Sequence, residues 1–538
     1  MARPINLGTV FHDHAERTKQ TTLHLDRPFD IAPDGGIVCD AAALARLVDD
    51  TAGWLYGVGV RPGDRLAVIK DNHFDFVLTA AAATRIGATP ANIAAANSLT
   101  ALHALLHRLD PALVVMSASV VRRIVDSGDE VLGGRRTVVL PSVGVSLDRN
   151  ELPTGAIPFE DALAAARPAP VHLVGDDEPL LMTHTSGTTG VPKLVVQSPR
   201  TLRAASRLEL MPIPFVVSRR KDVVLSSISF AHWRAVTWAV AQTRFAPEKL
   251  VVVADHEPER VGRMLKEFRP TSIEACPNIF QRWRGLTRTH ADALTQVRLY
   301  ISTFDMVHPP TVRAFLAASK RRMPLWVASW GQSEVGPISS AIFTRGRLRR
   351  IGNPVTSDVG WTLPTVSRVR VTDPETGKRR GLGRPGLLLA ASRARCLNYL
   401  GESERHDRKD GGKWWNTGDI GYRDWLWRLK LVDREVDIIP GTSGLALEST
   451  LLDRVPEATE VTVLGVPGQL PVPVLCVDGD TLDEKRWRSA VADLPALADP
   501  IIVPWQDLPR TATWKVRRHE LRAAVLGTDA GYGTGLWT

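Results

Sequence analysis

One glycine- and hydroxyl-rich stretch constrains the fold of this chain more than any other feature of its sequence. It follows the apolar residues 180–182, which indicate the end of a buried strand. Glycines allow main-chain N–H groups to turn inward, hydroxyls add hydrogen-bond donors, and a lysine adds a point charge. A buried strand that leads into such a loop suits the binding of a polyphosphate. The stretch consists of Thr185, Ser186, Gly187, Thr188, Thr189, Gly190, Val191, Pro192 and Lys193.

This stretch differs from the common Walker phosphate loop. No glycine is followed, after four residues, by Gly-Lys-Ser or Gly-Lys-Thr, and Pro192 directly precedes Lys193. Taken alone, a short string of this kind is equally typical of a flexible Ser/Thr/Gly loop. Stretches further along the chain decide between the two interpretations.

Length and composition indicate a globular protein of several domains. A chain of 538 residues is too long for one ordinary core, so about two or three domains are expected. The four cysteines form no CxxC or Cys/His cluster, which argues against a disulfide framework or a zinc site and for a reducing compartment. The first residues lack a signal-peptide core, and no apolar window is long enough to span a membrane. We therefore expect a soluble, cytoplasmic protein.

The formal net charge of +9 makes nucleic-acid binding one hypothesis. However, the basic residues are scattered in short clusters, such as residues 347–350 and 378–380. We interpret these clusters as solvated surface and expect no nucleic-acid partner. A positive field also attracts anionic small molecules.

Helical and strand patterns alternate along the chain. Apolar spacing predicts helices over residues 42–55 and 74–85, with a buried strand at 66–69 between them. Such alternation predicts a mainly parallel sheet covered by helices on both faces, that is, an α/β fold. Further strands are predicted at residues 223–227, 250–254, 272–275, 298–302, 325–327, 383–390 and 461–466, and a further helix at 482–491.

Three later stretches complete a recognisable set with the glycine- and hydroxyl-rich loop. They are Ser-Trp-Gly-Gln-Ser-Glu at 329–334, Trp-Trp-Asn-Thr-Gly-Asp at 414–419, and the run at 508–518 that contains Lys515. Together these stretches resemble the motifs of the adenylate-forming (AMP-binding) superfamily, which includes acyl-CoA and aryl-CoA synthetases, adenylation domains of peptide synthetases and luciferases. The resemblance spans residues 7–522.

This resemblance implies the architecture. We expect an α/β protein with a large N-terminal AMP-binding domain of layered, mainly parallel sheets and helices, residues 1–433. A small, mobile α+β C-terminal lid domain, residues 434–538, is expected to follow. The implied cofactors are ATP and Mg²⁺, and CoA is left open.

The resemblance also implies a role for each matching residue around the nucleotide. Residues 185–193 are expected to hold the β- and γ-phosphates. Asp419 is suited to the ribose hydroxyls because a carboxylate only accepts hydrogen bonds. Glu334 is suited to Mg²⁺, which prefers carboxylate and phosphate oxygens. The remaining implied contacts are adenine stacking for Trp330, with Gly331 and Gln332 beside it, the α-phosphate for Ser333, and the ribose for Arg434.

Lys515 falls on the position of the catalytic lysine of the superfamily, which implies that it bridges substrate and phosphate oxygens. His232 matches a histidine that lines the acid pocket, although a lone histidine beside aromatics is otherwise typical of core packing. Thr303 and Phe304 stand where the superfamily has two glycines of that pocket. Phe304 should shrink or reshape the pocket, which favours a small or flat substrate.

Several departures from the superfamily pattern fall near the segment that serves its second half-reaction. Asp433 replaces a glycine, Val436 replaces a polar hinge residue, and residues 437–448 form a shorter segment without the usual lysine. Trp514 replaces the glycine before Lys515. Because this segment lines the pantetheine channel in the superfamily, adenylation is the firm expectation and transfer to CoA is the open one.

We therefore expect an ATP-dependent, AMP-forming ligase. It would adenylate a small or aromatic carboxylic acid and then transfer the acyl group to CoA. The alternative is a CoA-independent enzyme that passes its activated group to an amine or a carrier protein, including activation of nitrite to diazotise an amine. A third hypothesis, a non-catalytic nucleotide-binding relative, would be favoured by loss of Lys515 or Glu334, and both are present. The substrate, the acceptor and the oligomeric state stay open.

Overall fold

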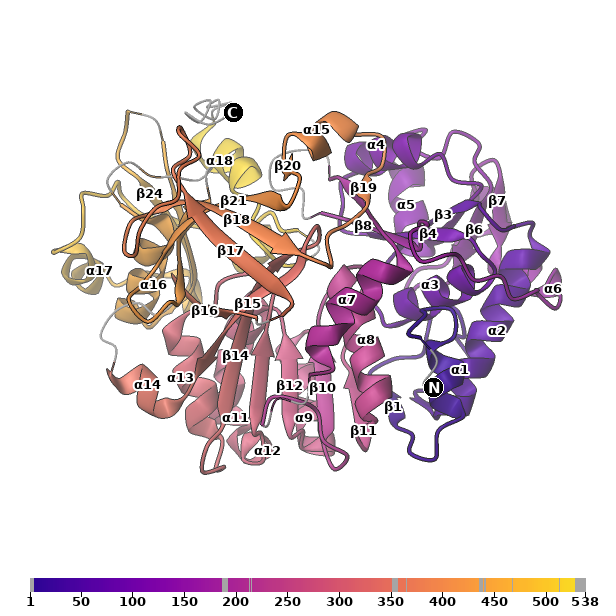
Figure 1. The fold of residues 1–538 in the computed structure, drawn as a ribbon, viewed down its shortest axis with the longest axis horizontal. Coiled ribbons are helices and arrows are strands. Elements are labelled where there is room, and N and C mark those ends of the chain that lie inside the picture. The colour runs from indigo at the N-terminus through magenta and orange to yellow at the C-terminus, as the bar shows by residue number, and fades with distance from the viewer. Residues whose placement is uncertain are drawn as a thin grey trace. The chain divides into compact units, whose positions relative to one another are not determined.

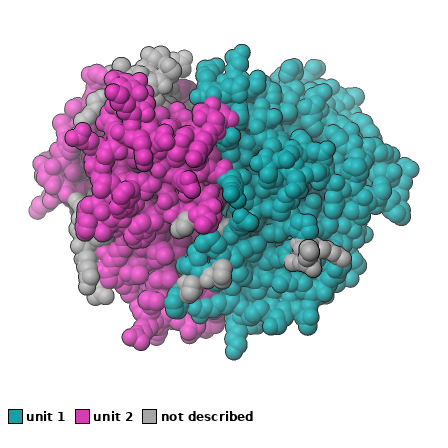
Figure 2. Space-filling model, in the orientation of Figure 1, with its two compact units in different colours: residues 1–264, 393–408 teal, residues 265–392, 409–538 magenta. Residues whose placement is uncertain are grey.

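The computed structural model describes residues 4–185, 192–211, 213, 215–350, 357–363, 365–434, 439, 442–466, 468–511 and 513–527. The chain divides into two compact units, residues 1–264 with 393–408 and residues 265–392 with 409–538 (Figure 2). Strands and helices alternate along the chain (Figure 1), so the predicted α/β class is confirmed. The predicted domain boundary between residues 433 and 434 falls inside the second unit and stays a prediction.

The larger sheet of the first unit has the strand order β19-β9-β8-β4-β3-β5-β6-β7. The strands from β8 to β7 run parallel, as the sequence predicts, whereas β9 pairs antiparallel with β8 and β19 antiparallel with β9. Their bounds are β3 (Arg65–Lys70), β4 (Thr89–Ala94), β5 (Leu113–Ser117), β6 (Thr137–Leu140), β7 (Ala156–Pro158), β8 (Leu181–His184), β9 (Leu194–Gln197) and β19 (Asn398–Tyr399).

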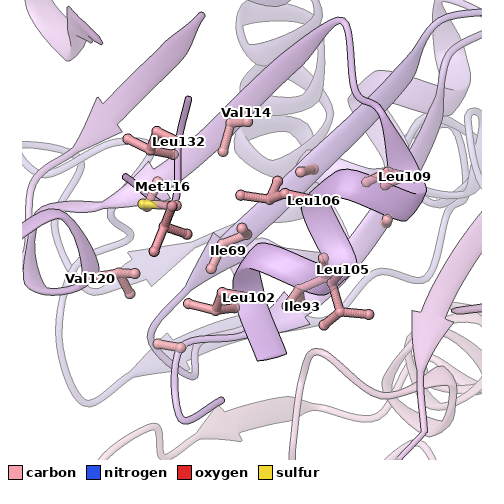
Figure 3. Packing of buried hydrophobic residues seen from close by; sticks show 14 of the residues in the cluster. Ile69, Ile93, Leu102, Leu105, Leu106, Leu109, Val114, Met116, Val120 and Leu132 are labelled. Atoms are coloured by element: carbon pink, nitrogen blue, oxygen red, sulfur yellow. The ribbon is translucent and has the colours of Figure 1, made fainter. Parts of the chain in front are cut away.

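One face of this sheet is covered by α4 (Leu99–Leu109), which forms part of a fully apolar core (Figure 3). The helix begins where the Ser98 side chain accepts a hydrogen bond from the Ala101 N–H at 3.2 Å. Its apolar residues recur at helical spacing, so one stripe faces the sheet. The core residues from this stripe are Leu102, Leu105, Leu106 and Leu109, and they pack with Ile69, Ile93 and Met116 of the strands.

The first unit also contains three parallel strands, β1 (Thr22–Leu25), β10 (Val223–Ser227) and β11 (Lys249–Val252), with β2 (Val38–Cys39) antiparallel to β1. The predicted helix over 42–55 lies within α2, whose first turn is capped by Asp40. Besides α4, the helices in this part of the chain are α1 (Val10–Ala15), α2 (Ala41–Gly57), α3 (Asp75–Arg85), α5 (Ala118–Ser127), α6 (Phe159–Ala164), α7 (Pro199–Glu209), α8 (Trp233–Phe245) and α9 (Pro258–Phe268).

The second unit joins parallel and antiparallel strands in the order β17-β18-β21-β22-β16-β15-β14-β13-β12. The strands β12, β13 and β14 are parallel, and the others pair antiparallel. The bounds are β12 (Ser272–Ala275), β13 (Leu299–Ser302), β14 (Leu325–Gln332), β15 (Gly336–Phe343), β16 (Asp358–Thr362), β17 (Ser367–Thr372), β18 (Gly386–Ser392), β21 (Trp414–Arg423) and β22 (Leu429–Arg434), with β20 (Asp410–Gly411) beside β21.

The C-terminal part of the second unit has its own sheet, β23-β24-β25, and two apolar clusters. The helix α16 begins at Ser443, whose hydroxyl accepts a hydrogen bond from the Ala446 N–H at 3.2 Å. The bounds are β23 (Ala458–Leu464), β24 (Val472–Val477), β25 (Ile501–Ile502), α10 (Pro277–Arg282), α11 (Leu286–Thr289), α12 (Ala291–Leu294), α13 (Pro309–Ala318), α14 (Arg345–Arg350), α15 (Ser403–Asp407, in the first unit), α16 (Gly444–Arg454), α17 (Glu484–Val491) and α18 (Arg518–Leu526). Within the described ranges, none of the helices has the length and apolar character needed to cross a bilayer.

Candidate active site

The carboxyl ends of three parallel strands of the second unit lie in one row. Strand register pairs Ala275 of β12 with Ser302 of β13, and Ser302 with Ala328 of β14. The chain segments that follow these residues therefore emerge at the same edge of the sheet, beginning with Cys276 and Thr303. In open α/β sheets this edge is where ligands bind.

The segment after β13 turns sharply at Phe304. This residue adopts φ +85°, a backbone conformation that bulky side chains rarely take. The turn presents Asp305, whose Oδ1 accepts a hydrogen bond from the Met306 N–H at 2.9 Å. The strand below is fixed by the Trp326 indole N–H, which donates to the Ser302 hydroxyl at 2.9 Å. The predicted pocket residues Thr303 and Phe304 thus lie at the ligand-binding edge.

The predicted motif at 329–334 begins inside a strand instead of following it. β14 continues to Gln332 because β15 pairs with it antiparallel, with a register shift between Trp330 and Gly331. Glycine is required at 331, because a Cβ there would lie 2.5 Å from the carbonyl oxygen of Gly336. Trp330 and Gln332 are two residues apart, so their side chains lie on the same face of the strand, and both reach one neighbour, Asp419.

Asp419 is the centre of a small hydrogen-bond network. Its Oδ2 accepts from the Trp330 indole N–H at 3.2 Å and from the Gln332 amide at 3.0 Å. Arg434 lies opposite Asp419 in the β21–β22 ladder, with 3.5 Å between its Nε and Asp419 Oδ1. The structure therefore brings together Trp330, Gln332, Asp419 and Arg434.

Ser333 and Glu334 form the turn between β14 and β15, and both side chains are buried. Within the described residues, no group of three or more His, Cys, Asp or Glu side chains is arranged to hold a metal ion. A single buried carboxylate such as Glu334 nevertheless suits Mg²⁺ that arrives with ATP. This ion is usually held by one or two carboxylates together with substrate phosphates.

Lys515 is held in a tight turn. Its N–H donates to the Thr511 hydroxyl at 3.1 Å, and its carbonyl accepts from the Thr511 N–H at 2.8 Å. The preceding residue, Trp514, adopts φ +66°, a left-handed conformation that glycine adopts far more readily than a bulky residue. The Trp514 ring stacks on Trp505, with ring centroids 5.6 Å apart and planes at 19°.

The charged groups that act on Lys515 come from the Asp419 network and from the carboxyl ends of β12 and β13. Burial lowers the pKa of the Lys515 ammonium, and the Arg434 guanidinium lowers that pKa further. The Asp305 and Asp419 carboxylates and the Cys276 thiol raise it. Lys515 is thus in electrostatic contact with the predicted ribose residues and with the edge of the parallel strands.

The predicted phosphate loop and His232 belong to the first unit. Thr185 and Lys193 close the base of the loop, since the Thr185 N–H donates to the Lys193 carbonyl at 2.9 Å and the Lys193 N–H to the Thr185 hydroxyl at 3.1 Å. The predicted residues Ser186, Gly187, Thr188, Thr189 and Gly190 lie outside the described residues. His232 caps α8, because its Nδ1 accepts from the Arg234 N–H at 3.0 Å.

Comparison with known proteins identifies the family. A family model described as AMP-binding enzyme matches residues 12–400. The chain belongs to the AMP-binding enzymes. This AMP-binding enzyme is 36% identical, over 98% of its own length and 97% of the relative's, to the 3-amino-2-hydroxy-4-methoxybenzoate diazotase of Streptomyces cremeus. It is 25% identical to a 3-aminoavenalumate diazotase of a Streptomyces species, over 81% of this chain and 76% of that protein.

The fold of this AMP-binding enzyme also matches solved structures. A crystal structure of a benzoate CoA ligase from Burkholderia xenovorans superposes with a TM-score of 0.77 at 19% identity, covering 96% of this chain and all of the other. At this identity the likeness shows a shared fold. The family model, the 36% identical relative and this shared fold together confirm the predicted resemblance to adenylate-forming enzymes.

The sequence motifs of this AMP-binding enzyme do not indicate two further residues at this edge, Asp305 and Cys276. Both directly follow predicted parallel strands or their first turn, and that position is the signal that could have found them. Their relation to Lys515 depends on strand register and on a turn more than two hundred residues downstream. No local pattern encodes that relation.

Proposed function

We propose that this AMP-binding enzyme activates nitrite with ATP and transfers the nitroso group to an aromatic amine. The observation that carries the proposal is the 36% identity over nearly the whole chain to a protein named a diazotase. Two features of the site support it as well. Bulky side chains stand at Phe304 and Trp514, and a carboxylate, Asp305, stands at the carboxyl edge of the parallel strands.

In the first half-reaction, a nitrite oxygen attacks the α-phosphorus of ATP and the bond to pyrophosphate breaks, giving a nitrous–adenylic anhydride. Lys515 holds the attacking oxyanion against the α-phosphate, where its charge counters the negative charge on the phosphate oxygens. When bound, Mg²⁺ held by Glu334 neutralises charge on the phosphates. Positioning and electrostatics supply the catalysis in this step.

In the second half-reaction, the amine nitrogen attacks the nitroso nitrogen. The nitrogen–oxygen bond to AMP breaks, and the amine nitrogen loses a proton. The resulting nitrosamine takes up a proton, loses water and becomes a diazonium ion. AMP and pyrophosphate are the other products.

We assign the nucleotide and pocket residues within the same proposal. Trp330 stacks on adenine beside Gly331 and Gln332, Asp419 and Arg434 hold the ribose, and Ser333 bonds the α-phosphate. The loop residues Thr185, Ser186, Gly187, Thr188, Thr189, Gly190 and Lys193 hold the β- and γ-phosphates, while His232, Thr303 and Phe304 line the substrate pocket. Residues 434–538 act as the lid.

Adenylation of a carboxylic acid followed by transfer to CoA is the second candidate, because the residues expected for adenylation are equally complete for that reaction. The resemblance implies that the segment at residues 437–448 lines the pantetheine channel. This segment departs from the superfamily pattern, and the departure favours an acceptor other than CoA.

The test is pyrophosphate release from ATP over a panel of nitrite, short acids, aromatic acids and amino acids, each with and without CoA. We expect release with nitrite that is indifferent to CoA and faster when an aminobenzoate is added. Release that requires a carboxylic acid and CoA, with a thioester product, would support the second candidate instead.

A further inference from the structure

Asp305 is a carboxylate at the point where the proposed chemistry takes place. It lies three residues beyond the end of β13, at the edge that also carries Cys276 and the Trp330 network. The chain turns at Phe304, which has a positive φ, directly before Asp305. The Met306 N–H donates a hydrogen bond to Asp305 Oδ1 at 2.9 Å. This contact fixes the carboxylate while engaging only one of its two oxygens.

Asp305 and Lys515 interact electrostatically without closing into an ion pair. The electrostatic influence of Asp305 is the largest that any charged group exerts on Lys515. Nevertheless, across the described ranges of the chain, no ion pair within 4.0 Å involves either of these two side chains. Two opposite charges that interact without pairing are both available to the polar groups of a bound molecule.

The charged groups near Asp305 and Lys515 favour different parts of a bound molecule. Lys515 and Arg434 are cations suited to the oxygens of nitrite and of the α-phosphate. Asp305 is an anion, which repels a carboxylate or nitrite and attracts a hydrogen-bond donor. Asp419 already accepts from Trp330 and Gln332, so Asp305 is the better placed carboxylate to accept from a second substrate.

We infer that Asp305 binds the amino group of the second substrate and accepts the proton that this nitrogen loses when it attacks the nitroso group. The amine N–H donates to the carboxylate before reaction, which directs the nitrogen lone pair toward the activated nitrogen. As the new nitrogen–nitrogen bond forms and AMP leaves, the proton passes to Asp305 and from there to water. This inference rests on the proposed function and names the residue that selects its acceptor.

The first arm of the test measures binding and needs no turnover. Calorimetry of the AMP complex compares 3-aminobenzoate with benzoate, for the natural protein and for Asp305→Asn. A hydrogen bond to a charged group predicts a preference of about 10- to 100-fold for the amine, lost in the variant. Equal affinities for the two ligands in the natural protein would overturn the inference, as would a preference that survives in Asp305→Asn.

The second arm separates the half-reactions in single turnovers. In Asp305→Asn, nitrite-dependent pyrophosphate release should change far less than the amine-dependent release of AMP, which should slow by about 10²- to 10⁴-fold. Asp292→Asn, an exposed carboxylate on α12, is the matched control and should leave both steps unchanged. Equal slowing of both steps, or no slowing of the second, would contradict the inference.

The two arms also distinguish failure of the inference from failure of the proposed function. If the natural protein prefers the amine through Asp305 but releases no pyrophosphate with nitrite, the amine site stands and nitrite activation is wrong. If nitrite is activated and transferred equally well by Asp305→Asn, the proposed function stands and the role of Asp305 is wrong.

Discussion

At the scale of single residues, Phe304 and Trp514 show the same unusual choice. The resemblance implies that both replace a glycine of the superfamily pattern, and both keep a backbone that suits glycine, with φ +85° and +66°. Holding a bulky side chain in this region costs roughly 1–2 kcal/mol. The two residues flank Asp305 and Lys515, so the strained positions lie beside the groups assigned to the chemistry.

Substitution of Trp514 tests this strain. Trp514→Gly removes both the strained backbone and the stacking on Trp505, and the stacking contributes about 0.5–1.5 kcal/mol. Trp514→Ala removes the stacking but keeps a side chain at positive φ. We expect the glycine variant to be more stable than the alanine variant by about 1 kcal/mol in denaturant unfolding. The reverse order, usual where φ is negative, would show that the turn is unstrained.

Lys515 is expected to act in the transition state more than in binding. Lys515→Ala should slow pyrophosphate release by about 10²- to 10³-fold, while ATP affinity changes only a few-fold. Lys485→Ala, on the surface of α17, is the control. An unchanged rate in Lys515→Ala would refute the assigned role.

The same lysine predicts a pH profile. The ammonium must be protonated to hold an oxyanion, so activity should fall as pH rises through the pKa of Lys515. Burial lowers that pKa from 10.5, so the alkaline limb should lie below the ordinary lysine value. A rate that persists to pH values above 10.5 would contradict a protonated Lys515 in the site.

At the scale of elements, Glu460 ties the lysine turn to α10. Its carboxylate accepts from the Asn278 amide at 2.6 Å and from Arg510 Nη1 at 3.2 Å, and both ionic side chains are almost fully buried. Arg510 in turn donates to the Trp514 carbonyl at 3.1 Å. The turn that carries Lys515 is therefore positioned by the buried pair of Glu460, on β23, and Arg510.

Removing this carboxylate leaves the Arg510 charge buried without its partner. We expect Glu460→Ala to lower the free energy of unfolding by about 3–5 kcal/mol and to slow pyrophosphate release, because the turn loses its anchor. Glu457→Ala is the matched control, since its partner Arg486 is half exposed, and it should cost less than about 1 kcal/mol. Similar losses in both variants would show that burial of the pair does not matter.

Elements with strong local patterns could be predicted from the sequence. The strand predicted at 272–275 coincides with β12, and the helix predicted over 42–55 lies inside α2. The extension of β14 through Trp330 to Gln332 could not, because it depends on antiparallel pairing with β15 and on a register shift. The position of Asp305 near Lys515 could not be predicted for a related reason, since it depends on strand register and on a distant turn.

At the scale of the whole molecule, His14 of the first unit and His308 of the second unit should make stability depend on pH. Burial lowers the pKa of His14 and of His308 to about 4. Between about pH 6.5 and pH 4 the unfolded chain binds protons that the folded chain does not, so acidification destabilises the fold. Each histidine contributes a slope of about 1.4 kcal/mol per pH unit at most.

The measurement is urea unfolding at pH 7 and pH 5 for the natural protein and for His14→Asn/His308→Asn. The variant should lose less stability on acidification. Glu448, whose pKa burial raises, acts in the opposite sense, but it is present in both proteins and cancels in the comparison. An identical loss in both proteins would show that these histidines titrate normally in the folded state.

The most direct test of the central proposal follows the nitrogen atom itself. The enzyme is incubated with ATP, Mg²⁺, isotopically labelled nitrite and an aminobenzoate, and the product is trapped by azo coupling and weighed by mass spectrometry. The proposal predicts one labelled nitrogen in the azo product, dependent on ATP and indifferent to CoA. If no labelled azo product forms and the aminobenzoate is converted to a CoA thioester once CoA is supplied, the proposal is contradicted.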